Sequence, residues 1–107
     1  MDVAVAPTTH AAEKRAAPAA EDALWYKDGL IYQVHVKSFF DSNNDGIGDF
    51  PGLISKLDYI ADLGVNVIQL LPSDEFPGDV SWGYNPAYIF AIESSYGGPN
   101  GLRRLVD

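Results

Sequence analysis

Residues 65–71 (VNVIQLL) form a nearly continuous apolar run that stops at Pro72. A strand with one solvated face alternates apolar and polar side chains, whereas a strand covered on both faces of a parallel sheet is apolar almost throughout. The run therefore predicts a buried strand in a parallel sheet.

The segment before this run has the pattern of a helix. Pro51 stands where a first helical residue is favoured, and Asp49 lies just upstream at a capping position. Gly64 is expected to end the helix as a left-handed C-terminal cap. Apolar residues recur between them at helical spacing and form one stripe, namely Leu53, Ile54, Leu57, Ile60 and Ala61.

Further elements flank this helix and strand. Residues 30–36 are rich in β-branched and aromatic side chains, which predicts a strand, and His35 within them is expected to be a hydrogen-bonded core histidine. Residues 101–106 have the pattern of a helix opening, with Asn100 as its N-cap. The order strand, helix, strand, long loop and helix start predicts an α/β fold of right-handed βα units.

Residues 41–49 (DSNNDGIGD) place oxygen-bearing side chains at alternate positions around a glycine turn. Ca²⁺ prefers about six to eight oxygen ligands, and one short loop can supply most of them. Gly46 permits the sharp bend between the ligands. The pattern predicts a metal site whose ligands are the side chains of Asp41, Asn43, Asp45 and Asp49 and the carbonyl group of Ile47.

The loop matches the first nine positions of an EF-hand but has Gly52 where the EF-hand needs a bidentate glutamate. A strand-like run also precedes it where an EF-hand has a helix. The loop is therefore predicted to be a metal loop of another fold. The alternative is a polar turn, since Asn, Asp and Gly favour turns for backbone reasons alone. Ca²⁺ fits the number of ligands, and Mg²⁺, which demands tighter octahedral geometry, is the alternative ion.

Residues 81–88 (SWGYNPAY) concentrate aromatic side chains beside polar groups on a long connection after the second predicted strand. In α/β folds, ligands bind on such loops at the C-terminal ends of strands. A Trp or Tyr ring can stack on the C–H face of a sugar while neighbouring polar groups bind its hydroxyls. Trp82 and Tyr84 are thus candidate saccharide-binding residues. The alternative is that these aromatic side chains pack the loop onto the end of the sheet.

Composition excludes several other classes. The net charge of −8 argues against a nucleic-acid partner, which demands a basic surface. The chain has no cysteine, which excludes a disulfide framework and fits a cytoplasmic protein. No apolar run approaches the roughly 18 residues of a membrane span, so no membrane partner is expected. Residues 1–22 are Ala-rich with scattered Pro and charges, and they are predicted to be a disordered tail without the features of a secretion signal.

The order of these motifs resembles a known family. Residues 24–40 (LWYKDGLIYQVHVKSFF), the loop 41–49 and the continuation to Pro72 closely resemble trehalose synthases, members of the α-amylase superfamily (glycoside hydrolase family 13). Residues 73–86 and 95–107 look more like the α-amylases, branching enzymes and trehalohydrolases of that superfamily. The resemblance covers residues 24–107.

The resemblance implies that residues 23–107 are the N-terminal part of a catalytic (β/α)₈ TIM barrel, namely its first two βα units, incomplete. Such enzymes act on α-glucosidic bonds with retention of configuration, using two carboxyl groups about 5–5.5 Å apart. In the family these carboxylates follow the fourth and fifth strands, so no catalytic residue is expected among these 107 residues. Tyr84 falls at the tyrosine that stacks on the sugar at the cleavage site, and residues 41–49 fall at the family's metal loop.

Three functional interpretations follow. The leading one is part of a retaining glycoside hydrolase or transglycosylase that acts on α-1,4-glucosidic bonds of an α-glucan or maltose-type saccharide and is inactive alone. A trehalose synthase is the second, although Ser81 stands where end-cutting members of the family carry an aspartate. A non-catalytic, metal-dependent carbohydrate-binding fragment is the third. A truncated reading frame without function is the remaining alternative.

Overall fold

The computed structural model of the chain describes residues 23–78 and 80–107. The predicted tail, residues 1–22, lies outside the described residues. Contacts divide the chain into two compact units. The first contains residues 23–32 and 57–69 of the described part, and the second contains residues 33–56 and 70–107 except for position 79.

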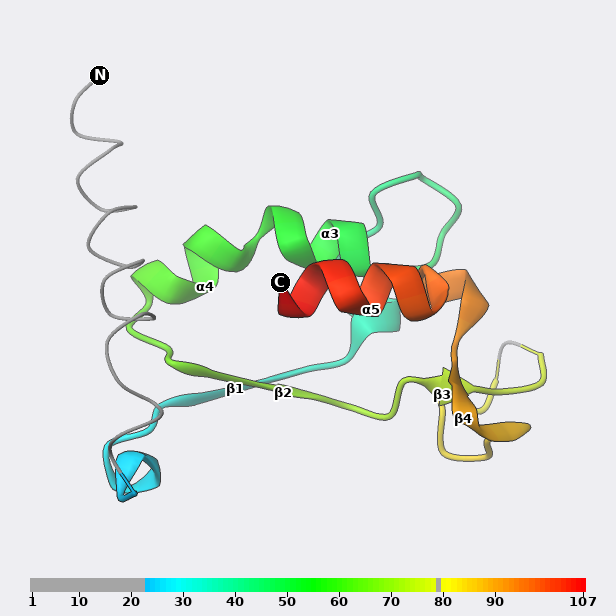
Figure 1. Cartoon of the computed structure of the whole chain (residues 1–107). Helices are drawn as coiled ribbons and strands as arrows, with labels where there is room; N and C mark the ends of the chain where they lie inside the picture. The colour runs from blue at the N-terminus through cyan, green and yellow to red at the C-terminus, as the bar shows by residue number, and fades with distance from the viewer. Residues whose placement is uncertain (1–22, 79) are drawn as a thin grey trace. The chain divides into compact units, whose positions relative to one another are not determined.

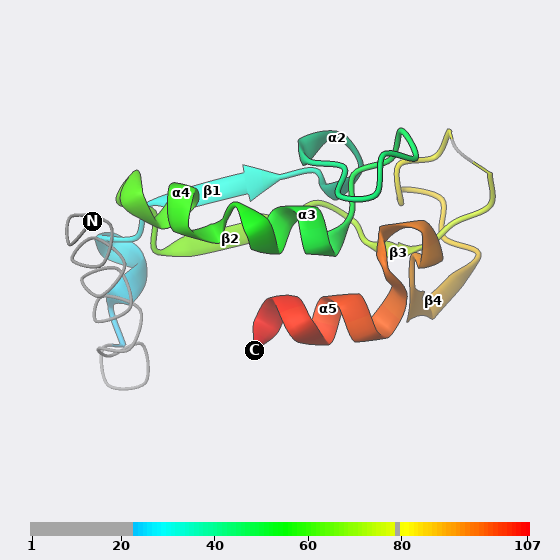
Figure 2. The same cartoon turned by 90° about the horizontal axis from the view of Figure 1, so that it is seen from above.

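Strands β1 (Ile31–Val34) and β2 (Val67–Leu70) form a two-stranded sheet. At one end the N–H groups of Asn66 and Val67 donate to the Leu30 carbonyl, and at the other the Leu71 N–H donates to the Val34 carbonyl at 2.9 Å. Residue numbers rise together along both strands, so the strands are parallel, as Figure 2 shows. The prediction of a parallel pair is confirmed.

The burial predicted for β2 is wrong. Its apolar side chains are half-buried and Gln69 is exposed, so the described residues do not cover both faces of the strand. The first strand is also shorter than predicted. The strand ends at Val34, although His35 is still extended at φ −96° and ψ 109°, and Val36, which is 2% exposed, begins the short helix α2 (Val36–Phe39).

The predicted single helix after Pro51 is observed as two helices, α3 (Phe50–Ser55) and α4 (Leu57–Asp62). Lys56 separates them with φ −109° and ψ 4°, and its N–H donates to the carbonyl oxygens of Ile54 and Leu53. The predicted caps are confirmed at both ends. Asp49 accepts a hydrogen bond from the Gly52 N–H at 2.7 Å, and Gly64 has φ +91°.

The first unit contains a 3₁₀ turn, η1 (Trp25–Lys27), together with α4 and parts of β1 and β2. Ile60 is the buried residue of α4, with 1% of its surface exposed. Asn66 joins the two strands through its side chain, whose Oδ1 accepts the Leu30 N–H at 2.7 Å. This side-chain bond extends the pairing of the two strands beyond the ladder.

The second unit holds α2, α3, a β-hairpin, a 3₁₀ turn and a helix. These elements are β3 (Asp74–Glu75), β4 (Tyr88–Ile92), η2 (Ser94–Tyr96) and α5 (Gly98–Val106). Helix α5 runs beside α3 (Figures 1 and 2). A glycine favours this close approach, because a methyl group on Gly101 would lie 3.0 Å from Cδ2 of Phe50. The buried ring of Tyr96 contacts the buried rings of both Phe50 and Phe76 edge to face.

Two further expectations are corrected by the second unit. The sequence predicts a long loop from Ser73 through Tyr96, interrupted by the short apolar piece of residues 88–92. That piece is observed as β4 in an antiparallel hairpin, in which Asp74 faces Ile92 and Glu75 faces Tyr88 across an irregular register. Asn100 is inside α5 instead of capping it, and its Oδ1 accepts a hydrogen bond from Arg103 Nη1 at 3.1 Å. Gly97, at φ +117°, is the N-cap residue instead.

We expect Gly48→Ala to lower the free energy of unfolding by about 2–4 kcal/mol, because the new methyl group would overlap the carbonyl oxygen of Val36 and lie 2.8 Å from that of Lys37. Gly46→Ala is the matched control. It meets no atom within 4 Å and bears only the strain of φ +89°, about 1–2 kcal/mol. Urea denaturation followed by circular dichroism measures both, and equal losses would contradict the packing account.

Candidate functional site

The carboxylate of Asp41 organises the loop of residues 41–49. Its Oδ1 accepts the N–H groups of Asn43, Asn44 and Asp45 at 3.2, 2.8 and 3.3 Å, and its Oδ2 accepts that of Gly46 at 2.7 Å. Desolvation favours the neutral acid, but these four donors outweigh it and hold the pKa of Asp41 below its ordinary value. Asp41 is therefore a carboxylate at neutral pH, as a metal ligand must be.

The middle of the loop is a series of tight turns. Asn44 and Gly46 both have positive φ, at 63° and 89°. Asn43 Oδ1 accepts the Asp45 N–H at 3.3 Å, and Asp45 Oδ1 accepts the Ile47 N–H at 2.8 Å. Each predicted side-chain ligand from Asp41 to Asp45 thus also supports the backbone two or more residues later.

The last predicted ligand, Asp49, closes the loop and starts α3. Its carboxylate is 5% exposed, accepts the Ser42 N–H at 3.2 Å and caps α3 through Gly52. The backbone N–H groups of Asp49 and Gly48 donate to the carbonyl oxygens of Phe40 and Lys37 at 3.1 and 2.7 Å. These four hydrogen bonds join the two ends of the loop to each other, to the chain around α2 and to the first turn of α3.

The oxygen atoms that the loop of residues 41–49 offers have the chemistry of ligands for a divalent cation. Three carboxylates, one amide oxygen and one carbonyl oxygen are the hard oxygen donors that Ca²⁺ and Mg²⁺ prefer. Within residues 23–78 and 80–107, no three His, Asp or Glu side chains gather closely enough to hold a metal by themselves. A cation at this loop would therefore depend on Asn43 and Ile47 as well as on the aspartates, and the metal site stays a prediction.

The aromatic loop of residues 81–84 lies in the connection between β3 and β4 and is folded as a tight turn. The Tyr84 N–H donates to the Ser81 carbonyl at 3.0 Å, and the Gly83 N–H donates to Ser81 Oγ at 3.3 Å. Gly83, at φ +86°, passes so close to the end of β2 that a methyl group there would lie 2.6 Å from the Pro72 carbonyl oxygen. Trp82 and Tyr84 remain 55% and 63% exposed, so both rings present surface to a ligand.

His35, directly after β1, contacts this loop. Its ring lies edge to face against Trp82, with centroids 5.5 Å apart and an interplanar angle of 83°. The Nδ1 atom is buried and has no hydrogen-bond partner among the described residues, so the expected hydrogen-bonded core histidine is not confirmed at that atom. Burial and the nearby positive charge of Lys37 hold the pKa of His35 below its ordinary value.

Glu93 is a buried acid whose structural role the sequence pattern did not predict. It accepts the Phe76 N–H at 3.0 Å, and the Ser95 N–H and hydroxyl at 3.1 and 2.6 Å. Burial opposes its ionisation, but the hydrogen bonds, first that of the Ser95 hydroxyl, keep the pKa of Glu93 below its ordinary value. A carboxylate held in this way caps η2 and is poorly suited to donate a proton. The one signal was its place directly before Ser94 and Ser95.

The buried charge of Glu93 also affects its neighbour in the core. Burial, and then the charge of Glu93, raise the pKa of Tyr96 to about 12, so that phenol stays neutral at all ordinary pH values. Asp74 and Glu75 form β3, where Glu75 accepts the Ser94 N–H at 3.0 Å, and Asp79 lies outside the described residues.

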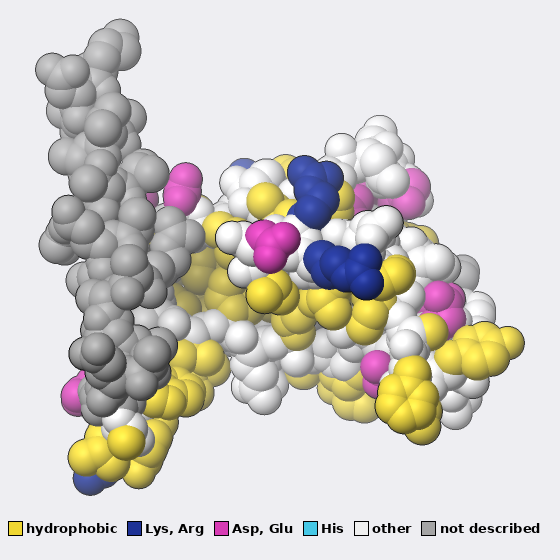
Figure 3. All heavy atoms as spheres, in the orientation of Figure 1, with side chains coloured by type: hydrophobic (Ala, Val, Ile, Leu, Met, Phe, Trp, Pro, Cys, Tyr) yellow, Lys and Arg dark blue, Asp and Glu magenta, His cyan; other side chains and the backbone are white. Residues whose placement is uncertain are grey.

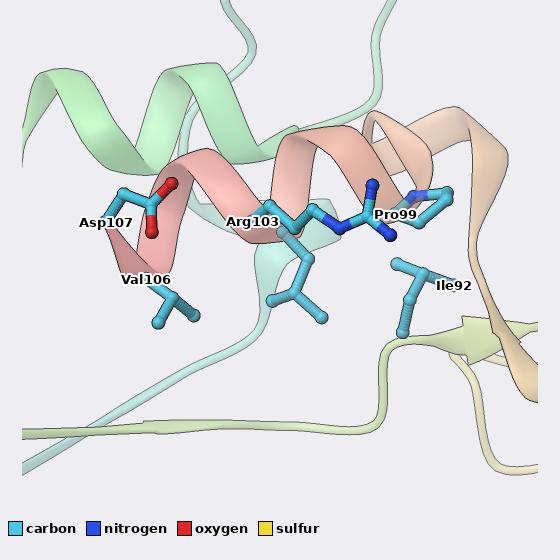
Figure 4. A pocket seen from close by; sticks show the side chains of 6 residues that line it. Ile92, Pro99, Arg103, Val106 and Asp107 are labelled. Carbon is cyan, nitrogen blue, oxygen red and sulfur yellow. The ribbon is translucent and has the colours of Figure 1, made fainter.

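A shallow pocket of about 320 Å³ lies against α5 (Figure 4). It is lined by Ile92, Pro99, Leu102, Arg103, Val106 and Asp107. None of the predicted ligands or saccharide-binding residues lines it. The candidate site therefore consists of the loops of residues 41–49 and 81–84, and not of this pocket.

The comparison with known proteins identifies the family. A family model described as the catalytic domain of alpha amylase matches residues 33–107. The chain belongs to the alpha-amylase catalytic domain family. The resemblance predicted from the sequence is thereby confirmed at the level of the superfamily.

Individual relatives agree with this family. The chain is 42% identical over 81 residues to malto-oligosyltrehalose trehalohydrolase of Saccharolobus solfataricus, covering 76% of this chain and 14% of that protein. It is 61% identical over 56 residues to trehalose synthase of Thermus thermophilus, covering 52% of this chain and 6% of that protein. The crystal structure of the isomaltulose synthase SmuA from Protaminobacter rubrum is similar with a TM-score of 0.72 and 39% identity, covering 77% of this chain and 14% of that one.

The chain thus spans about one seventh or less of the length of these relatives. Its α/β character fits a part of their fold. No helix in the described residues is both long and apolar enough to cross a bilayer.

We expect the free energy of unfolding to fall as the pH is lowered through about 6.5, the ordinary pKa of an unfolded histidine. The folded chain disfavours the imidazolium of His35, so protonation favours the unfolded chain. His35 makes its full contribution to stability above that pH, and this contribution is lost as the pH falls toward the lower pKa of His35 in the folded chain. Urea midpoints at pH 7.5 and 5.5 measure it, while Asp41 and Glu93 titrate at lower pH.

His35→Phe is the control for this pH dependence, because it keeps a ring against Trp82 and removes the titrating group. Its midpoint should change less between the two pH values than that of the unmodified chain. The same change in both proteins would show that His35 is not the responsible group.

Proposed function

We propose that the chain is part of a retaining glycoside hydrolase or transglycosylase that acts on α-1,4-glucosidic bonds of an α-glucan or a maltose-type saccharide. The match of residues 33–107 to the alpha-amylase catalytic domain carries this proposal. Under it, residues 23–107 supply the first two βα units of a TIM barrel. The parallel pairing of β1 and β2 supports that assignment, since the strands of such a barrel are parallel.

The position of the two candidate loops supports a ligand-binding role. The loop of residues 41–49 comes after β1 and α2. Residues 81–84 lie between β3 and β4, where Gly83 approaches Pro72 just after the end of β2. Barrel enzymes bind their substrates at the C-terminal side of their parallel strands. Tyr84 would stack on a sugar ring, and Trp82 would widen the aromatic surface. Both side chains are more than half exposed, as a ligand platform requires.

The catalytic carboxylates are proposed to lie outside this chain. Retaining chemistry needs a nucleophile and an acid/base about 5–5.5 Å apart, with the pKa of the acid raised. The two acids that are buried among the described residues have structural roles instead. Asp49 caps α3, and Glu93 caps η2 with its pKa lowered. No catalytic role is assigned to any of these 107 residues.

A trehalose synthase is the second candidate within the same family. The 61% identity to the Thermus thermophilus enzyme favours it, although that match covers 52% of this chain. Ser81, where the end-cutting members carry an aspartate, argues against it. A non-catalytic carbohydrate-binding role, and location in the cytoplasm, remain predictions.

The loop of residues 41–49 would hold Ca²⁺, or alternatively Mg²⁺, through the side chains of Asp41, Asn43, Asp45 and Asp49 and the carbonyl of Ile47. A divalent cation there would neutralise part of the charge of the three aspartates of this loop. The loop itself already fixes Asp41 and Asp49 through backbone donors. Binding would therefore stabilise a loop that is largely organised.

We expect Ca²⁺ to raise the melting temperature. A cation at 100 times its dissociation constant adds about 2.7 kcal/mol, which corresponds to on the order of 10 °C for a domain of this size. Asp45→Ala should abolish most of the shift, because Asp45 is an exposed ligand whose loss leaves the cap of α3 intact. Thermal melts with Ca²⁺, Mg²⁺ or a chelator measure this effect.

Asp28→Ala is the matched control for the metal test. It removes the same charge from an exposed position outside the loop and should keep the full shift. A chain whose melting temperature does not respond to either cation would exclude the metal site.

We expect Tyr84→Ala to weaken maltose binding by about tenfold, because a stacked aromatic ring contributes roughly 0.5–1.5 kcal/mol beyond its buried area. Tyr88→Ala, which removes a 69% exposed tyrosine from β4, should bind maltose as well as the unmodified chain. Isothermal titration calorimetry compares the three proteins. Equal affinities for all of them would remove Tyr84 from the binding site.

The chain alone should not turn over maltose, trehalose or starch above a buffer control, because the carboxylate pair is missing. Release of glucose or change of the sugar composition is measured by chromatography after long incubation. Turnover that persists in repeated, separately purified preparations would refute the assignment of the catalytic residues to other parts of the enzyme.

A further inference from the structure

The contact between His35 and Trp82 joins the ends of the two parallel strands. His35 follows β1 directly, and Trp82 lies on the loop between β3 and β4, which approaches Pro72 just after the end of β2. The edge-to-face geometry, with centroids 5.5 Å apart, is one of the arrangements that aromatic rings prefer. Neither the predicted metal ligands nor the stacking role of Tyr84 explains this contact.

Two contacts tie the turn of residues 81–84 to the residues around the strand ends. The backbone of Gly83 passes against Pro72, and the ring of Trp82 packs against His35. The hydrogen bonds from Tyr84 and Gly83 to Ser81 are internal to the turn. They fix the shape of the turn but not its place.

The backbone of Trp82 makes the histidine contact important. Trp82 has φ +57°, a left-handed conformation that disfavours residues with a side chain. Such a residue keeps this conformation only when surrounding contacts hold it. Removal of the His35 ring would allow Trp82 to relax, and the backbone shift would reach Tyr84 two residues later.

The role of His35 in this contact is packing and not hydrogen bonding through its buried nitrogen. Nδ1 has no partner among the described residues, so no polar bond at that atom holds the ring. A side chain of similar shape without the nitrogen should therefore replace it. This property separates a positioning role from a direct polar contact with a sugar.

We propose that His35 is a positioning residue, which holds Trp82 against the end of β1 and thereby places Tyr84 for stacking on a pyranose ring. This inference rests on the proposed function. Under this inference, the position of the saccharide-binding surface formed by Trp82 and Tyr84 depends on a residue directly after β1 as well as on the loop that carries these two side chains.

The test uses the whole chain with Trp25→Phe. The sequence has two tryptophans, so Trp82 becomes the sole tryptophan emitter. In this background, His35→Leu fills the space without an aromatic ring, and His35→Phe restores the ring. Emission of Trp82 is recorded first without ligand and then during titration with maltose.

His35→Leu should shift the emission of Trp82 to longer wavelength and weaken maltose binding by about two- to tenfold, the worth of one aromatic pair. His35→Phe should restore both quantities. Tyr88→Ala is the control for loss of an exposed ring elsewhere in the second unit and should change neither. His35→Leu was chosen over His35→Ala because it leaves no cavity.

The possible failures are distinguishable. Absence of maltose binding by the unmodified chain overturns the proposed function, and the role of His35 in saccharide binding falls with it. Maltose binding that His35→Leu leaves unchanged overturns this inference alone. Failure of His35→Phe to restore binding also overturns it, because the nitrogen and not the ring would then be required.

Discussion

The two hydrogen bonds accepted by the Asp49 carboxylate are the interaction on which the second unit depends. One comes from Ser42 at the start of the loop, and the other comes from Gly52 in the first turn of α3. Gly52 must be glycine, since a methyl group there would overlap the Phe40 carbonyl oxygen. One buried carboxylate thereby joins the loop, the helix and the chain that leaves α2. Any ligand of this loop is consequently coupled to the beginning of α3.

The same unit places its aromatic groups in two environments. Phe50, Phe76 and Tyr96 are buried and pack α3, the hairpin and α5 together. Trp82, Tyr84 and the aromatic side chains of β4 are exposed, and Figure 3 shows apolar side chains standing out over the hairpin. Phe90 is 97% exposed. Membership of the alpha-amylase family, together with a span of 14% of two relatives, gives a reason for exposed apolar surface, because those relatives have much more chain with which to cover it.

Several features of the fold could be predicted from residue types and their spacing along the sequence. The cap at Asp49, the left-handed Gly64 and the parallel pairing of the two apolar runs were all predicted and are observed. The sequence pattern did not predict that the helix is divided at Lys56 or that β1 ends early. Both depend on where side chains such as Val36 and Leu53 find burial, which spacing along the chain does not show. Asn100 was a reasonable N-cap by residue type, but the left-handed Gly97 started the helix earlier. Likewise, His35 became noticeable only when the fold brought it against Trp82.

The network around Asp41 also bears on how this protein ages. An Asp-Gly bond such as that between Asp45 and Gly46 is prone to cyclise when the glycine nitrogen attacks the aspartate side-chain carbon and releases water, leaving isoaspartate after hydrolysis. Here that N–H is held by Asp41 Oδ2 at 2.7 Å, and the Asp45 carboxylate is held by the Ile47 N–H at 2.8 Å. Both reacting groups are fixed by other partners, which keeps the nitrogen from turning toward the carbon. The geometry that arranges the oxygens of the loop therefore also slows its spontaneous chemical damage.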